Sequence, residues 1–271
     1  MRIGVCVGAP VRGAERTAAD MIGLAAEIGY DYVEMSIAPM MGFDEDGLSY
    51  VKQSLAAAKI KCECLNVFFP SDMRLTGEGR DEAAIAEYAA RAFARASDIG
   101  AEIVVFGSGG ARNIPEGCPY ELAFEQLAGT MRIMSDAASA YGIRIAIEAL
   151  NRNECNVILS MSEADRLMVA ANRPNVKLLF DYYHFMLESD SAGTLRGLLD
   201  EGKIIHAHFA EPEGRGYPDG AKPERAVMFD VLRGAGYGAR VSIEARLRDP
   251  DAPRAEMTAG LAAMRALTAS I

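Results

Sequence analysis

Short apolar runs rich in β-branched residues alternate along this chain with longer amphipathic stretches rich in Ala and Leu. The short runs predict strands near Ile3–Val7, Tyr32–Ile37, Cys62–Phe68, Glu102–Phe106, Arg144–Glu148, Val176–Asp181, Lys203–Phe209 and Arg240–Ala245. The amphipathic stretches predict helices that include Ala14–Ile28, Asp81–Ile99, Tyr120–Ala140 and Met161–Ala170. Nearly continuous apolar strands that alternate with helices are typical of a parallel sheet covered by helices.

The number of these strand–helix units selects among parallel-sheet folds. Eight units in 271 residues favour a closed (β/α)8 TIM barrel, with a doubly wound open sheet as the alternative. Glycine follows several helical stretches, as in Ile28-Gly29 and Ile99-Gly100, which is typical of helix C-caps. No Pro/Gly/Ser-rich linker divides the chain, so we expect a single TIM-barrel domain over residues 1–271.

Charge and composition narrow the classes of partner. The formal net charge is −10, and an acidic surface repels nucleic acid and anionic membranes. No apolar run reaches the roughly 18 residues of a membrane span, and the N-terminus lacks a signal-peptide pattern. The five cysteines include no CxxC motif, so we interpret them as reduced packing residues. These features predict a cytoplasmic protein without a nucleic-acid or membrane partner.

Residues suited to metal binding stand at the ends of the last four predicted strands. These residues are Glu148, Asp181, His208 and Glu244. In a TIM barrel the C-terminal ends of the strands meet at one mouth, where active sites form. Three carboxylates this close would repel one another unless a cation lay between them. We therefore predict one divalent metal ion there. A set of oxygen ligands with one nitrogen favours Mn²⁺ and permits Mg²⁺, Co²⁺ or Zn²⁺.

The three histidines all lie near the sixth and seventh predicted strands: His184, His206 and His208. His206 and His208 share a strand face by alternation, so one could be a ligand and the other a supporting or core residue. We choose His208 as the ligand because it is nearer the C-terminal end of its strand.

Several other polar residues follow predicted strands and could border the same mouth. Arg215 lies in a Gly-flanked loop after the seventh strand and could bind a substrate hydroxyl or carboxylate. Asn66 lies near the end of the third predicted strand. Glu34 lies near the end of the second and could line the mouth or have a surface or salt-bridge role. Arg112 ends a Gly-rich stretch and could reach a substrate or cap a carboxylate. That stretch lacks the GxGxxG pattern of nucleotide-binding loops.

At these positions the sequence resembles the xylose isomerase-like TIM barrel superfamily, and within it the sugar (phosphate) isomerase/epimerase group that includes D-tagatose and D-psicose 3-epimerases. The resemblance spans essentially the whole chain. Its most specific segments are Ile147–Glu154, Phe180–His184, His206–Glu211 and Ser242–Glu244.

The resemblance implies roles for individual residues. It implies that Glu148, Asp181, His208 and Glu244 bind the metal and that the two glutamates also transfer protons. Glu154 and His184 match positions that hold the substrate. The family has an arginine six residues after the metal histidine, whereas this chain has Gly214 there and Arg215 one step later. The resemblance also implies a small sugar or polyol substrate and a homodimer or homotetramer.

The chemistry that fits these residues is proton transfer next to a ketone. A metal ion polarises the carbonyl and stabilises an enediolate, while carboxylates on its two faces remove and return a proton. Two bases invert the carbon, and one base that returns the proton to the adjacent carbon isomerises the sugar. Loss of a β-hydroxyl gives dehydration, as in inosose dehydratases of the same superfamily. A sugar-binding barrel without catalysis is a further alternative. A nuclease of the endonuclease IV type would need many more histidines.

Overall fold

The computed structural model describes residues 1–13, 18–220 and 222–269. In this part of the chain eight strands pair in chain order, and β8 pairs with β1 to close a barrel. The strands are β1 (Arg2–Val7), β2 (Tyr32–Ser36), β3 (Cys62–Asn66), β4 (Ile103–Phe106), β5 (Arg144–Glu148), β6 (Val176–Asp181), β7 (Ile204–Phe209) and β8 (Arg240–Ile243). All pairs are parallel. The (β/α)8 prediction is confirmed, and the open sheet is excluded.

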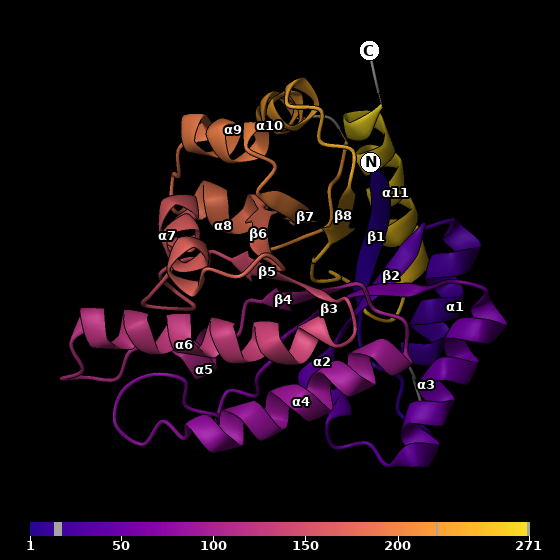
Figure 1. The fold of residues 1–271 in the computed structure, drawn as a ribbon. Coiled ribbons are helices and arrows are strands. Elements are labelled where there is room, and N and C mark those ends of the chain that lie inside the picture. Colours follow the sequence, from indigo (N-terminus) through magenta and orange to yellow (C-terminus); the bar gives the residue numbers. More distant parts are fainter. Residues whose placement is uncertain (14–17, 221, 270–271) are drawn as a thin grey trace.

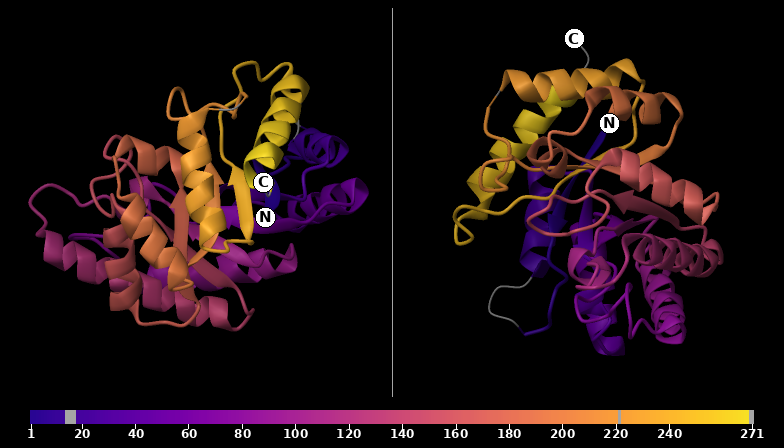
Figure 2. Two further views of the ribbon diagram at one scale, coloured as in Figure 1. Left: turned by 90° about the horizontal axis from the view of Figure 1, so that it is seen from above. Right: turned by 90° about the vertical axis from the view of Figure 1, so that its left-hand side faces the viewer.

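Helices surround the strands on the outside of the barrel (Figures 1 and 2). Between successive strands lie α1 (Ala18–Ile28), α3 (Glu45–Ala58), α4 (Glu82–Asp98), α6 (Tyr120–Ser139), α7 (Met161–Ala171), α9 (Ala192–Asp200) and α10 (Pro223–Gly234), and α11 (Pro253–Thr268) follows β8. Short helices follow three strands at their C-terminal ends: α2 (Ile37–Met40), α5 (Gly109–Arg112) and α8 (Tyr182–Leu187). Figure 1 shows β1 beside β8 and α11, where the first and last strands pair and close the barrel.

The predicted element boundaries agree with the structure to within about two residues. β2 ends at Ser36 because Ile37 begins α2, and β8 ends at Ile243, one residue before Glu244. The predicted helix Ala14–Ile28 is α1 from Ala18 onward, and residues 14–17 lie outside the described part. Gly29 and Gly100 have φ of 98° and 85°, as expected for glycine after a helix.

Alternation along the strands places the polar residues inside the barrel above an apolar layer. Ala146 and Leu179 belong to a buried cluster inside the strands. Glu148 and Asp181 lie two residues further along the same strands, so their side chains point to the same face. In the sheet register Asp181 is opposite His208. The core therefore supports a polar layer at the C-terminal end of the barrel.

Candidate metal centre and active site

Glu148, Asp181, His208 and Glu244 come together at the mouth of the barrel, as the strand-end pattern predicts. One ligand atom from each lies within 4.8 Å of the others. His208 Nδ1 lies 3.3 Å from Glu148 Oε1, 3.5 Å from Glu244 Oε2 and 3.8 Å from Asp181 Oδ2. Glu148, Asp181 and His208 are buried, whereas Glu244 is slightly exposed to the pocket above. Their role as metal ligands remains a prediction.

The chemistry of this cluster fits a divalent cation. Asp181 Oδ2 is buried and has no hydrogen-bond partner among the described residues. Burial raises the pKa of Asp181 to about 6, and burial together with Glu244 raises the pKa of Glu148. Burial alone would lower the pKa of His208, but Glu34 and Glu244 raise it well above the usual value. A metal ion would replace the proton at Nδ1 and stabilise the ionised carboxylates.

Glu34 lies beneath the cluster and fixes the orientation of His208. Its Oε1 accepts a hydrogen bond from His208 Nε2 at 2.9 Å, and its Oε2 accepts from His206 Nε2 at 2.8 Å and Ser242 Oγ at 2.7 Å. Burial alone would raise the pKa of Glu34, but the two histidines lower it, so the carboxyl is ionised. Because His208 donates its Nε2–H to Glu34, Nδ1 faces the three carboxylates, and its lone pair would be available to a metal ion that replaces the proton there.

The sequence left two alternatives for Glu34, a place lining the mouth or a surface or salt-bridge role, and the structure shows a buried salt bridge with both histidines. Glu34 is fully buried between the layer of apolar residues and the candidate ligands. The same carboxylate binds His206, which lies two residues before His208 on β7 and so one layer below the candidate metal position. A signal for this role was present in the sequence, because a carboxylate between Val33 and Met35 in a buried strand requires a partner.

His184 stands beside the cluster with one ring nitrogen directed toward it. The backbone N–H of Asn151 donates to His184 Nδ1 at 3.1 Å, so Nε2 carries the proton in the neutral ring. Burial lowers the pKa of His184, which favours this neutral form. Nε2 is 3.9 Å from Glu148 Oε1 and has no hydrogen-bond partner in the described part of the chain. His184 can therefore donate to a bound molecule. Sequence reasoning did not identify Asn151.

Arg215 reaches into the mouth despite its shift by one position from the family pattern. Its guanidinium donates to Glu244 Oε2 at 2.6 Å and to both carboxylate oxygens of Glu154 at 3.2 Å. It also lies 4.9 Å from the centre of the Tyr183 ring. Arg215 adopts a left-handed backbone conformation with φ of 52°, and Gly214 before it has φ of 72°. This turn brings the side chain over the cluster.

Two further residues lie against the candidate glutamates. Asn66 donates from Nδ2 to Glu244 Oε1 at 3.0 Å, while its Oδ1 accepts from Ser36 Oγ at 2.7 Å. Gly107, directly after β4, approaches Glu148 so closely that an added Cβ would lie 1.8 Å from Glu148 Oε2. Asn66 therefore positions Glu244, Gly107 leaves room for the carboxylate of Glu148, and both residues border the cavity.

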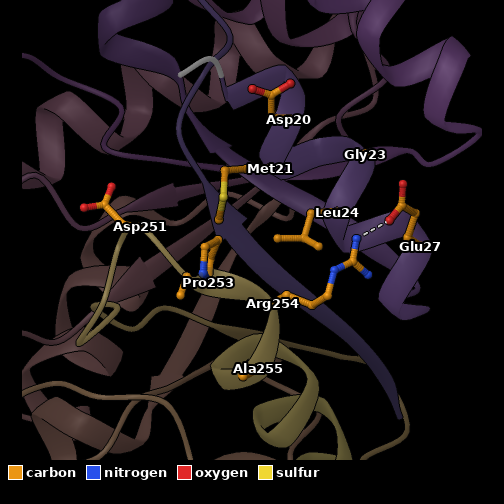
Figure 3. Close-up of a pocket in the computed structure, with 10 residues that line it drawn as sticks. Asp20, Met21, Gly23, Leu24, Glu27, Asp251, Pro253, Arg254 and Ala255 are labelled. Carbon is orange, nitrogen blue, oxygen red and sulfur yellow. Dashed lines mark hydrogen bonds and ion pairs between the residues drawn. The ribbon is translucent and has the colours of Figure 1, made fainter. Parts of the chain in front are cut away.

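The cluster opens into a pocket of about 320 Å³, a size suited to a small molecule. Its lining includes Asn66, Glu148, Glu154, Arg215, Glu244 and Arg246. A larger cavity of about 870 Å³ lies between α1 and α11, as Figure 3 shows, and contains the Arg254–Glu27 ion pair. None of the clustered residues lines it, so the smaller pocket is the candidate active site.

Arg112 has a structural role rather than a place in the pocket. It is fully buried and donates to the Phe106 carbonyl at 3.0 Å and the Ile158 carbonyl at 3.5 Å. The expectation that it could reach a substrate is therefore wrong.

Among the helices of the described residues, none is long and apolar enough to cross a membrane.

The model of one known protein family matches most of the chain. The xylose isomerase-like TIM barrel model matches residues 22–267. The chain belongs to this family.

Individual relatives give further points of comparison. A 2-oxo-tetronate isomerase of Haemophilus influenzae is 32% identical over 152 residues, which cover 55% of this chain and 55% of that protein. An L-ribulose 3-epimerase of Methylomonas sp. is 25% identical over 229 residues, covering 81% of this chain and 75% of that protein. The match to the isomerase spans only about half its length.

Solved structures show the same fold. A D-psicose 3-epimerase from Clostridium cellulolyticum H10, solved with D-tagatose, superimposes with a TM-score of 0.85. The alignment covers 100% of both chains at 18% sequence identity. At this identity the similarity establishes the barrel architecture alone.

Proposed function

We propose that this protein is a metal-dependent isomerase or epimerase of ketoses or related polyol ketones. The observation that carries this proposal is the buried cluster of three carboxylates and one imidazole beneath a pocket of about 320 Å³. Glu148, Asp181, His208 and Glu244 would hold the ion, with Mn²⁺ favoured by the oxygen-rich set. When bound, a divalent metal polarises a carbonyl and acidifies the neighbouring C–H group.

The family members support a ketonic sugar as the substrate class. The matched relatives are named for 2-oxo-tetronate and L-ribulose, and a structure of the same fold was solved with D-tagatose. Each of these compounds has a ketone beside hydroxyl-bearing carbons. The pocket volume suits a molecule of this size.

In this proposal Glu148 and Glu244 transfer the protons. They come from β5 and from the residue after β8, so they approach the pocket from two separated parts of the barrel rim. One carboxylate removes the proton next to the ketone, and the other donates a proton to the opposite face, which inverts the carbon. Arg215 and Asn66 contact Glu244 and so hold it for this step.

Four residues around the two glutamates would contact substrate oxygens. His184 offers the Nε2–H group, which has no hydrogen-bond partner among the described residues. Arg215 and Glu154 form an ion pair at the pocket and provide donors and acceptors for hydroxyl groups. Asn66 borders the same cavity from β3. This set would fix which carbon lies between the two bases.

Exchange of solvent deuterium into a ketose tests the proposal. Protein loaded with Mn²⁺ is incubated in D₂O with a panel of ketoses and inososes, and NMR identifies labelled carbons and products. We expect label at the carbon next to the ketone of at least one compound, and no label after a chelator has removed the metal. Inversion indicates an epimerase, a shifted carbonyl an isomerase, and loss of water a dehydratase. Binding without exchange would contradict the proposal in favour of a sugar-binding barrel without catalysis.

A further inference from the structure

Arg246 borders the candidate active-site pocket, and its charge has no partner in the part of the chain that the structure describes. It follows Glu244 by two residues, and its exposed side chain lines the same cavity as Arg215 and Glu154. Within the described residues its guanidinium takes part in no hydrogen bond or ion pair. A second positive group therefore stands at the rim of the pocket.

The backbone holds Arg246 at this rim. Its amide N–H donates to the carbonyl of Arg215 at 2.7 Å, and Gly216 forms a parallel bridge with Arg246. The loops after β7 and β8 are thereby joined at the mouth of the barrel. The two arginine side chains consequently begin from adjacent positions on one side of the pocket.

Exposed arginines without partners are common, so Arg246 has to be compared with the neighbouring Arg215 and Arg248 in ion pairing and in position relative to the pocket. The charge of Arg215 is already balanced, because two carboxylates bind its guanidinium. Arg248 is also exposed, but it pairs with Asp219 at 2.9 Å and does not line the pocket. Of these three arginines, Arg246 alone lines the pocket and has no carboxylate partner among the described residues.

We propose that Arg246 binds a carboxylate or phosphate on the substrate, so that the substrate is an anionic derivative of a ketose. This inference rests on the proposed function, because it assumes that the ketone lies at the cluster below. A guanidinium binds either anion through two parallel hydrogen bonds. The chain carries a net charge of −10, which repels anions at long range. A carboxylate or phosphate of the substrate therefore needs a positively charged side chain close to it in order to bind.

Four six-carbon compounds that differ mainly in their end groups test this subsite. D-Fructose is neutral, 2-keto-D-gluconate has a carboxylate at carbon 1, D-fructuronate has one at carbon 6, and D-fructose 6-phosphate has a phosphate there. Calorimetry measures the binding of each to the Mn²⁺-loaded protein, and deuterium exchange measures turnover. We expect at least one charged compound to bind about tenfold to a hundredfold more tightly than D-fructose. The preferred compound distinguishes carboxylate from phosphate and one end of the sugar from the other.

Variants assign this preference to Arg246. Arg246→Gln should abolish the advantage of the charged compound by raising its Kd and KM, and Arg246→Lys should restore part of it. Arg248→Gln is the matched control and should keep the wild-type preference. Equal binding of neutral and charged compounds, or a preference that survives in Arg246→Gln, would overturn the subsite.

The two proposals fail in different ways. Exchange into D-fructose, together with charged compounds that bind no more tightly than D-fructose, would support the enzyme and refute the anion subsite. Arg246-dependent binding of a charged compound, with no exchange into any ketose, would support the subsite and refute the isomerase proposal.

Discussion

Replacing Glu34 by glutamine should weaken metal binding although Glu34 is not a candidate ligand. The carboxylate accepts three hydrogen bonds, from His208, His206 and Ser242. Glutamine keeps one acceptor oxygen and brings an NH₂ group that can only donate. It also removes the negative charge that makes His208 a better ligand.

The two orientations of the new amide set the expected magnitude. If NH₂ faces His208 Nε2, that ring has to move its proton to Nδ1, the nitrogen directed at the carboxylates, and cannot bind a metal there. If NH₂ faces His206, that ring can shift its proton to its own Nδ1, which has no partner among the described residues. The second orientation keeps His208 usable, so we expect about tenfold weaker Mn²⁺ binding for Glu34→Gln. Glu34→Ala leaves both rings unpaired and should lose about a hundredfold.

The assay is a titration of Mn²⁺ into each variant, with the folded state checked by circular dichroism and thermal unfolding. Glu63→Gln is the matched control, because Glu63 is an equally buried glutamate that bonds Arg2 and Arg240 rather than the cluster. It should lose stability while keeping wild-type metal affinity. If folded Glu34→Gln binds Mn²⁺ as tightly as wild type, or if both variants lose the same affinity, then Glu34 does not orient the ligand.

Three further substitutions examine the surroundings of the cluster. Gly107→Ala places a methyl group 1.8 Å from Glu148 Oε2, so the carboxylate has to move and turnover should fall about 10²-fold. Gly23→Ala is the control and should keep full activity, because an added Cβ there has nothing within 4 Å. Equal rates for the two variants would contradict the close approach of Gly107 to Glu148. His184→Ala should lower turnover about tenfold or more while metal analysis still finds about one ion per chain, and loss of the ion would make His184 a ligand. Arg215→Lys retains the charge but cannot bridge two carboxylates, so KM should rise about tenfold in steady-state assays, and an unchanged KM would exclude a substrate contact.

The sequence allowed the fold and the four clustered residues to be predicted because both depend on local patterns. Alternation within each strand fixes which side chains point inward, and the barrel topology then brings Glu148, Asp181 and His208 to one mouth. Glu244 lies one residue past β8, yet its amide still bonds the Phe209 carbonyl at 2.9 Å, so it continues the strand geometry.

Contacts between distant segments could not be predicted in the same way. The bond from His208 to Glu34 joins residues 174 positions apart, and no local pattern records that pairing. The reach of Arg215 depends on its left-handed backbone, which sequence does not specify for an arginine. The closeness of Gly107 to Glu148 likewise required coordinates, because the surrounding Gly-rich stretch alone could not show which glycine has no room for a side chain.

The central claim is that two glutamates on opposite faces of one ketose transfer its proton. The most direct measurement is deuterium exchange in D₂O by Glu148→Gln and Glu244→Gln, each loaded with Mn²⁺ to wild-type occupancy, with Glu63→Gln as control. Glutamine retains an oxygen ligand but cannot accept the proton as a base. We predict that each variant loses on the order of 10² or more in epimerisation rate, and that each still exchanges only the epimer whose proton faces the remaining glutamate. Epimerisation at the wild-type rate by either fully loaded variant would contradict the two-base account.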